Sequence, residues 1–219
     1  MKKLLLILSL SCLPLSNFAQ DSDFGNWLIY IGSKQLNEKW NLHHEIQYRN
    51  YNAIGDLEQL LLRTGLGYTF KESKANLLLG YGYILSENYT TSSDDKTSIN
   101  EYRIFQQFTT KQSLGKLNIS HRYRFEQRFV EDDYKMRFRY FLSLNHPIIK
   151  IKDGEKQVYV SAYNEIFLNT KSSVFDRNRL YGGLGYKFNK KLKIELGYMN
   201  QFFENSGRDQ LNIITFYNF

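Results

Sequence analysis

Arginines and glutamates at every second position are the residues of this sequence whose types and spacing could do chemistry. From residue 122 to residue 128, arginine or glutamate stands at every second position, and the segment 135–139 has the same spacing in basic residues. Guanidinium groups donate paired hydrogen bonds to carboxylate or phosphate groups. Every second side chain of an extended strand lies on the same face, so the spacing predicts a cationic face that binds anions or forms ion pairs.

Histidine and serine could supply a base and a nucleophile, but their spacing argues against this. His43 and His44 are adjacent and therefore point to opposite faces of a strand, as do Ser120 and His121. His43 does share a face with Glu45, but no distance to an inward serine follows from the sequence. We expect no enzymatic activity.

Metal and phosphate sites are not indicated by the sequence either. The four histidines are scattered, and the only cysteine is Cys12. Two glycine-rich stretches, 80–82 and 182–185, lie inside strand patterns, where glycine permits bending or the close approach of another side chain. We therefore expect no metal and no cofactor.

Regular alternation of apolar and polar residues predicts the elements that hold these side chains. It recurs over segments of roughly ten residues separated by turn signals, as in the strands of a transmembrane β-barrel. Hydrocarbon offers the backbone no hydrogen-bond partner, so such strands must pair with one another and the sheet must close. The predicted strands are 24–33, 40–51, 57–70, 76–88, 98–112, 117–129, 135–145, 157–168, 178–189, 192–203 and 210–219.

The predicted fold class is all-β, a closed antiparallel up-and-down transmembrane β-barrel. The eleven segments conflict with the even strand numbers of bacterial single-chain barrels. We therefore expect about ten strands from Trp40 onward, with 24–33 as an added segment, or twelve strands if one segment has escaped recognition. Pro147 is expected to end the seventh segment.

The last segment, Gln210–Phe219, ends the chain on an aromatic residue. Such an ending resembles the signal by which barrel-assembly machinery recognises its clients, which makes Tyr217 and Phe219 the expected assembly signal. The turns alternate between a lysine-rich set and a polar set near residues 55, 92, 132, 173 and 206. Working back from a periplasmic C-terminus places the lysine-rich set in the periplasm and the polar set at the cell exterior.

Residues 1–19 have the features of an export signal that is cleaved. A lysine pair and a leucine-rich stretch precede a small-residue exit at Ala19. The barrel domain is then expected to cover residues 20–219, without cysteine. The residues before Cys12 also resemble a lipoprotein acylation site, which would anchor the product by lipid instead.

Composition supports a barrel in a membrane. The chain of 219 residues is long enough for one medium barrel, and 16% of its residues are aromatic, which suits belts at both lipid–water boundaries. No apolar run after the N-terminal segment approaches the roughly 20 residues of a membrane-spanning helix. The net charge of +7 could suggest nucleic acid. Export and the inward placement of the arginines argue against that partner.

Two interpretations of the barrel interior remain open. The first is an anion-selective constriction, because guanidinium groups bind carboxylate and phosphate. The second, which we favour, is a packed interior in which arginine and glutamate neutralise one another, since barrels of about eight strands are filled by their own side chains. The candidate lumen or anion-binding residues are Arg49, Arg63, Arg103, Arg122, Arg124, Arg128, Arg137, Arg139, Glu45, Glu126 and Glu165.

Two motifs and the terminal aromatic residue resemble a known family. The motifs are W-x-L-x-x-E-x-Q-Y-R at 40–49 and R-x-R-x-E-x-R at 122–128. They resemble the outer-membrane β-barrel family labelled domain of unknown function 2490, over essentially the whole mature chain. The resemblance implies a β-barrel fold and an outer-membrane location. It implies no established activity, so no catalytic residue is carried over.

We therefore predict a bacterial outer-membrane β-barrel protein that is either structural or a narrow pore favouring anions. Its expected partners are outer-membrane lipid, the barrel-assembly machinery and small anionic solutes, and not nucleic acid. Two alternatives are kept. One is an outer-membrane enzyme that modifies lipid, and the other is a soluble lipocalin-like carrier, whose apolar face would point inward.

Overall fold

The computed structural model of this chain describes residues 24–70, 72, 74–90, 95–151, 156–171 and 173–219, and their regular structure is entirely β. The expected export signal and Cys12 lie outside these residues. Most strand boundaries fall within a few residues of the predicted ones. The strands are β1 Gly25–Gln35, β2 Trp40–Asn50, β3 Leu57–Phe70, β4 Ala75–Tyr89, β5 Lys96–Leu114, β6 Leu117–Val130, β7 Asp133–Ile151, β8 Lys156–Asn169, β9 Phe175–Lys187, β10 Leu192–Phe202 and β11 Gly207–Asn218.

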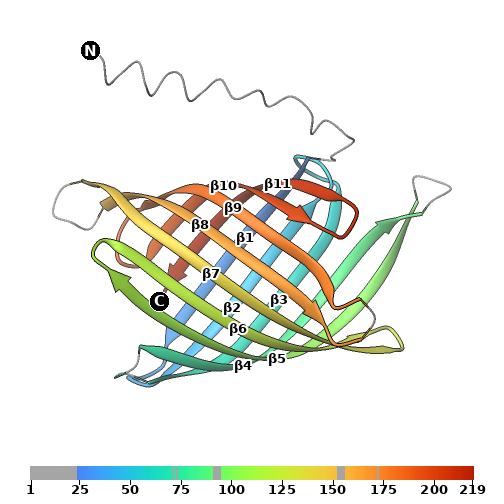
Figure 1. Ribbon diagram of the computed structural model, residues 1–219, viewed down its shortest axis with the longest axis horizontal. Helices are drawn as coiled ribbons and strands as arrows, with labels where there is room; N and C mark the ends of the chain where they lie inside the picture. Colours follow the sequence, from blue (N-terminus) through green and yellow to red (C-terminus); the bar gives the residue numbers. More distant parts are fainter. Residues whose placement is uncertain (1–23, 71, 73, 91–94, 152–155, 172) are drawn as a thin grey trace, which may run out of the picture.

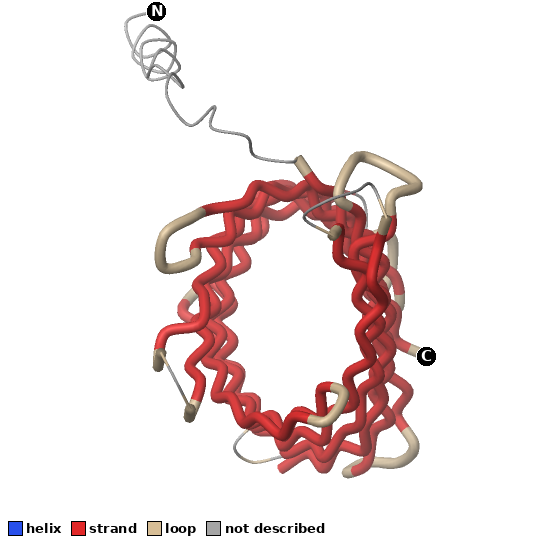
Figure 2. The backbone as a smooth tube through the Cα atoms, turned by 90° about the vertical axis from the view of Figure 1, so that its right-hand side faces the viewer, coloured by secondary structure: helices blue, strands red, loops and turns tan. Residues whose placement is uncertain are grey.

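The strands form a single closed sheet, which confirms the predicted barrel (Figure 1, Figure 2). Consecutive strands pair antiparallel, and β1 pairs in parallel with β11, with Gly25 opposite Gln210 and Ser33 opposite Asn218. The segment 24–33, which was expected as an addition to a barrel of about ten strands, forms β1. It belongs to the wall and brings the number of strands to eleven. A closed sheet of alternating strands with an odd number must contain one parallel pair, and that pair is β1 with β11.

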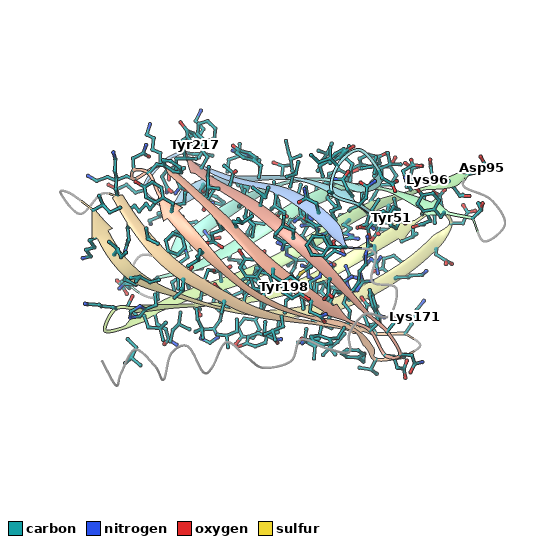
Figure 3. The ribbon with its side chains drawn as sticks, turned by 90° about the horizontal axis from the view of Figure 1, so that it is seen from above. Tyr51, Asp95, Lys96, Lys171, Tyr198 and Tyr217 are labelled. Atoms are coloured by element: carbon teal, nitrogen blue, oxygen red, sulfur yellow. The ribbon has the colours of Figure 1, made fainter. Side chains whose placement is uncertain are left out.

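The two ends of the barrel carry different links. The C-terminal end, where β11 finishes, carries the lysine-rich turns; the opposite end, here called the loop end, carries the polar set and the start of β1. Figure 3 shows Tyr217 at the C-terminal end and Tyr51, Lys96 and Lys171 at the loop end. Phe24 and Phe219 therefore lie at opposite ends of the barrel.

Outward and inward side chains follow the predicted parity on most strands. On β3, Leu62 and Leu66 are exposed outside, whereas Arg63 is buried inside. The buried polar parity contradicts the lipocalin-like alternative, which requires apolar side chains within. The interior is not wholly ionic, however, since an apolar cluster lines it along β1, β9, β10 and β11: Trp27, Ile29, Tyr181, Met199 and Ile214.

Glycines in the wall make room for aromatic rings inside the barrel. A Cβ atom at Gly80 would lie 2.2 Å from the Phe105 ring, and one at Gly185 would lie 2.1 Å from the Tyr159 ring. Gly183 likewise lies under Tyr181. These contacts confirm the predicted use of strand glycines for close side-chain approach.

The prediction that Pro147 ends a strand is wrong. Strand β7 continues to Ile151, and its register against β8 shifts between Pro147 and Ile149. Proline has no N–H to donate to the ladder, so it is accommodated at this irregularity without ending the strand.

Candidate functional site

Glu126 is the most densely surrounded carboxylate of the interior. It lies on β6 with no solvent exposure, and it accepts hydrogen bonds from two arginines of β7. Arg139 Nη1 donates to Oε1 at 2.6 Å, and Arg137 Nη2 donates to Oε2 at 2.7 Å. Arg124 and Arg103 lie 3.6 and 3.9 Å away. A buried carboxylate is favoured as an ion only with such partners.

Glu165, on β8, extends the ion-pair network across the next strands. Its Oε1 accepts hydrogen bonds from Arg139 Nη2 at 2.7 Å and from Arg122 Nη2 at 2.7 Å. Arg139 therefore bridges Glu126 and Glu165 and joins β6, β7 and β8 inside the barrel. Arg179 Nη1, on β9, lies 3.9 Å from the second oxygen of Glu165.

A second group of ion pairs lies nearer the loop end. Glu101 accepts hydrogen bonds from Arg103 at 2.6 and 2.8 Å and from Arg128 at 2.5 and 3.0 Å. Asp176, on β9, accepts one from Arg137 at 2.8 Å. The sequence-predicted arginines of β5, β6 and β7 thus share a small number of acids.

Two predicted arginines, Arg49 and Arg124, donate hydrogen bonds to amide oxygens. Gln47 and Gln59 accept hydrogen bonds from Arg49 at 2.6 and 2.8 Å. Gln107 accepts two from Arg124, at 2.9 and 2.6 Å. A neutral amide oxygen does not compensate the positive charge of its partner, so Arg49 contributes to a net positive interior, whereas Arg124 also lies 3.6 Å from Glu126.

The remaining predicted pair, Glu45 with Arg63, lies at the β2–β3 boundary. Arg63 Nη1 donates to Glu45 Oε1 at 2.6 Å, and both side chains are buried. Gln47 also donates to Glu45. The pair therefore forms a separate contact beside the network around Glu126.

Aromatic rings that the sequence analysis did not single out support the arginines. The ring of Phe167, on β8, lies 4.4 Å from the Arg139 guanidinium and 4.6 Å from that of Arg179. Trp27, on β1, lies 3.7 Å from the guanidinium of Arg49. Phe167 is two residues from Glu165 on β8 and therefore lies on the same face, so the alternation in the sequence could have placed its ring inside the barrel. Strand β1 is apolar on both faces, so its pattern could not place Trp27.

Together these side chains form a layer across the lumen, here called the interior plug: Arg49, Arg63, Arg103, Arg124, Arg137, Arg139, Arg179, Glu126, Glu165 and Phe167. The members come from β2, β3 and β5 to β9. A cavity of about 50 Å³ remains among residues from β2 to β9. Such a volume holds only a few water molecules. Arg122 and Arg128 lie at the edges of the plug and are partly exposed.

Between the plug and the C-terminal end, the interior is hollow. A cavity of about 440 Å³ lies against the plug, and a second one of about 520 Å³ lies at the mouth. The two cavities adjoin, because several residues line both of them, among them Lys111, Ser120 and Lys193. We name the two joined cavities the C-terminal vestibule.

Comparisons with known proteins identify the family of this chain. A family model described as "Protein of unknown function (DUF2490)" matches residues 24–212. The chain belongs to this family. It is also 31% identical over 165 residues to an uncharacterised protein of Methylorubrum extorquens. The aligned region covers 72% of this chain and 69% of that protein. No solved structure matches the chain. The predicted family is confirmed.

The histidines of this DUF2490 barrel lie on both faces of the wall, as the pattern predicts. His43 lines the vestibule with its Nε2 atom 3.4 Å from Glu45, whereas His44 lies outside against Tyr30 and Phe219. Ser33 is paired with His43 across β1 and β2, but no hydrogen bond joins their side chains in the described part of the chain. Among the same residues, no group of acids, histidines or cysteines could hold a metal ion.

The two residues of the expected assembly signal lie at the C-terminal end of the DUF2490 barrel. The rings of Tyr217 and Phe219 make an edge-to-face contact with their centroids 4.6 Å apart. The Phe219 N–H donates to the carbonyl of Ser33 on β1 at 2.9 Å. The terminal residue is thus part of the seam that closes the barrel.

At the loop end, side chains beside two links meet. Asp56, between β2 and β3, accepts hydrogen bonds from Lys96 and from the Tyr89 hydroxyl, the latter at 2.8 Å. Lys96 also donates to the carbonyl of Leu57 at 2.8 Å. This loop-end contact ties the β2–β3 link to the β4–β5 link.

Proposed function

We propose that this DUF2490 protein is an outer-membrane β-barrel that spans the bilayer and keeps its lumen closed with the interior plug. The outward apolar face is the observation that carries the proposal. Leucines and isoleucines of neighbouring strands are exposed side by side, among them Leu42, Ile46, Leu62, Leu66, Leu77 and Leu79. Soluble monomers rarely expose an apolar surface of this extent.

Aromatic contacts on the outer face also support a membrane location. Near the C-terminal end, the ring centroids of Trp40 and Tyr68 are 5.1 Å apart, and those of Tyr186 and Phe188 are 4.6 Å apart. Near the loop end, Phe129 packs against Tyr134. Transmembrane barrels carry such aromatic girdles at both lipid–water boundaries.

Closure of the sheet gives every wall strand a partner on both sides, which hydrocarbon requires. In the described part of the chain, no helix has the length and apolar character needed to cross a membrane. That finding does not bear on strands.

The plug closes the lumen of the barrel. Its charge favours anions over cations among any small solutes that cross the lumen. Side chains from β2 to β9 leave only about 50 Å³ among them, so a solute larger than water must displace an arginine or an aromatic ring. The interior plug contains seven arginines and two glutamates, and Arg49 donates to neutral amides, which leaves a positive surplus. A positive surplus attracts anions and repels cations.

Membrane insertion is tested by fractionation. We expect the protein to stay with outer-membrane vesicles after a wash at alkaline pH and to require detergent for extraction, because its apolar face needs lipid or detergent. Release into buffer without detergent would contradict the membrane location.

Lumen closure is tested by conductance in planar bilayers. We expect no steady current from the native barrel and a steady anion-selective current from the Arg139→Ser, Glu165→Ser double variant, which shortens two plug residues at constant net charge. The matched control is Asp133→Ser with Lys135→Ser, an exposed pair outside the plug. A steady native current, or a double variant that stays closed, contradicts the proposed closure.

The alternative of a lipid-modifying enzyme is tested with labelled phospholipid. The one histidine–glutamate contact of the described residues, His43 with Glu45, lies inside the barrel and away from the bilayer. We therefore expect the folded protein to leave the phospholipid intact, and conversion of the lipid would favour the enzyme.

A further inference from the structure

Two lysines of the C-terminal vestibule face each other without an acid between them. Lys187, on β9, is directly opposite Lys193, on β10, and both line the mouth of the vestibule. Lys111 of β5 lines it as well. Among the described residues, none of these three lysines has a carboxylate oxygen within 4.0 Å. Like charges directly opposite in a sheet are destabilising.

The acid nearest in sequence to Lys193 is occupied by other donors. Glu195 accepts hydrogen bonds from the Tyr159 hydroxyl at 2.9 Å and from the Tyr181 hydroxyl at 3.4 Å. Among the described residues, five lysines and no carboxylate line the mouth cavity. Lys187 and Lys193 therefore repel each other across the sheet without an ion-pair partner at contact distance among the described residues, and an anion from outside would offset their repulsion.

One wall of the vestibule is apolar and begins at these lysines. The Lys193 Nζ atom lies 4.6 Å from the centroid of the Phe216 ring. Ile31, on β1, lies opposite Phe216, and Ile214, on β11, continues this wall toward the plug. The opposite wall presents hydroxyl groups from Ser120, Ser143 and Ser161.

We propose that the C-terminal vestibule binds a small amphiphilic anion, with its carboxylate or phosphate head on Lys187 and Lys193 and its apolar body along Phe216, Ile31 and Ile214. The head alone would not use the apolar wall, and a neutral apolar molecule would not offset the lysines. Cavities of several hundred Å³ with few polar anchors are typical of small-molecule sites. The proposal rests on the proposed function only in requiring that the C-terminal mouth is open to water.

Calorimetry on the full-length barrel in nanodiscs of zwitterionic phospholipid tests the site. The probes are octanoate and octyl phosphate, compared with octyl glucoside, which lacks charge, and with acetate and inorganic phosphate, which lack an apolar body. We expect saturable binding of the two octyl anions only, after subtraction of empty nanodiscs. Binding of octanoate but not octyl phosphate, or the reverse, identifies the head group and still supports the site.

The matched variants are Lys187→Gln with Lys193→Gln, and Lys39→Gln with Lys116→Gln. The second pair lies at the same end but lines neither cavity. We expect the first pair to weaken octanoate binding by about tenfold or more, and the second pair to leave it unchanged, because charged hydrogen bonds are lost only in the first. Phe216→Ala is expected to weaken octanoate as well.

Several results would overturn the site. One is that octyl glucoside or inorganic phosphate binds as tightly as octanoate. Another is that neither octyl anion binds. A third is that the two lysine-pair variants weaken octanoate binding equally. Insertion of each variant is checked by flotation with liposomes. Failure of binding in an inserted, non-conducting barrel refutes the site and leaves the proposed function standing, whereas failure of insertion refutes the function.

Discussion

At the scale of single residues, Glu126 is the acid of the interior that we expect to contribute most to the stability of the plug. It is fully buried and accepts hydrogen bonds from Arg137 and Arg139, with Arg124 at 3.6 Å. Removing one partner of a buried ion pair leaves an uncompensated charge, which costs far more than the pair itself contributes. The plug should therefore respond to this residue more strongly than to any exposed acid.

We predict that Glu126→Ala lowers the free energy of unfolding by about 3–5 kcal/mol, the usual loss when a buried pair is broken. The control is Asp133→Ala, whose pair with Lys135 is exposed on both sides and should contribute no more than about 1 kcal/mol. Urea unfolding in lipid vesicles, followed by tryptophan fluorescence, measures both. Equal losses would contradict the assigned role of Glu126.

The loop-end contact gives a second residue-scale prediction, on pH. Burial alone would raise the pKa of Asp56, but hydrogen bonds from Lys96 and Tyr89 hold the pKa below its ordinary value of 3.8. A carboxyl with a lowered pKa stabilises the folded state fully above its ordinary value and loses that contribution as the pH falls through the lowered one. The contact should therefore persist at neutral pH and open only in acid.

A carbon-13 NMR titration of the Asp56 carboxyl measures this shift. We expect a midpoint below 3.8 in the native barrel and a return toward 3.8 in Lys96→Met, which removes the first donor. The prediction fails if the native midpoint lies at or above that value.

At the scale of elements, the pairing of β1 decides how the barrel closes. Leu28 lies opposite Ile213 in the parallel pair, and Leu196 lies opposite Ile213 on the other side of β11. A ten-stranded wall would pair β2 with β11 and leave Leu28 outside the sheet. Cross-linking distinguishes the two arrangements.

We predict that the pair Leu28→Cys and Ile213→Cys forms a disulfide under mild oxidation, because adjacent strands bring Cα atoms within the range that a disulfide spans. The control pair Leu28→Cys and Leu196→Cys is two strands apart and should stay reduced. The shift in gel mobility reports the bond. Cross-linking of the control but not of the first pair would refute the parallel seam.

At the scale of the whole molecule, the odd strand number sends the two ends of the described chain to opposite ends of the barrel. Strand β1 begins at the loop end, and β11 finishes at the C-terminal end. We propose that the C-terminal end lies in the periplasm, as expected from the sequence, so that the loop end and Phe24 face the cell exterior. The C-terminal vestibule then opens toward the periplasm.

Surface labelling with a membrane-impermeant maleimide checks this orientation. In intact cells we expect label on Ser173→Cys and Phe24→Cys, which lie at the loop end, and none on Lys191→Cys. The last variant should react only after the outer membrane is permeabilised. Label on Lys191→Cys alone in intact cells would reverse the orientation.

The sequence by itself determined the strands and, on most of them, which face is inward. The segment 57–70 is predicted and observed with the same bounds, because alternation and turn residues act between near neighbours. The inward parity of Arg63, Glu126 and Glu165 follows from the same local rule. The family, too, could be recognised from two short motifs and the terminal residue.

Only the tertiary structure decided what depends on distant strands. The parallel closure of β1 on β11, and the choice of the Trp27 face as inward, follow from sheet closure, which no local pattern contains. The partners of each arginine depend on which strands face one another across the lumen. For the same physical reason, alternation predicts a polar interior, but only the closed barrel separates it into a filled plug and an open vestibule lined by lysines.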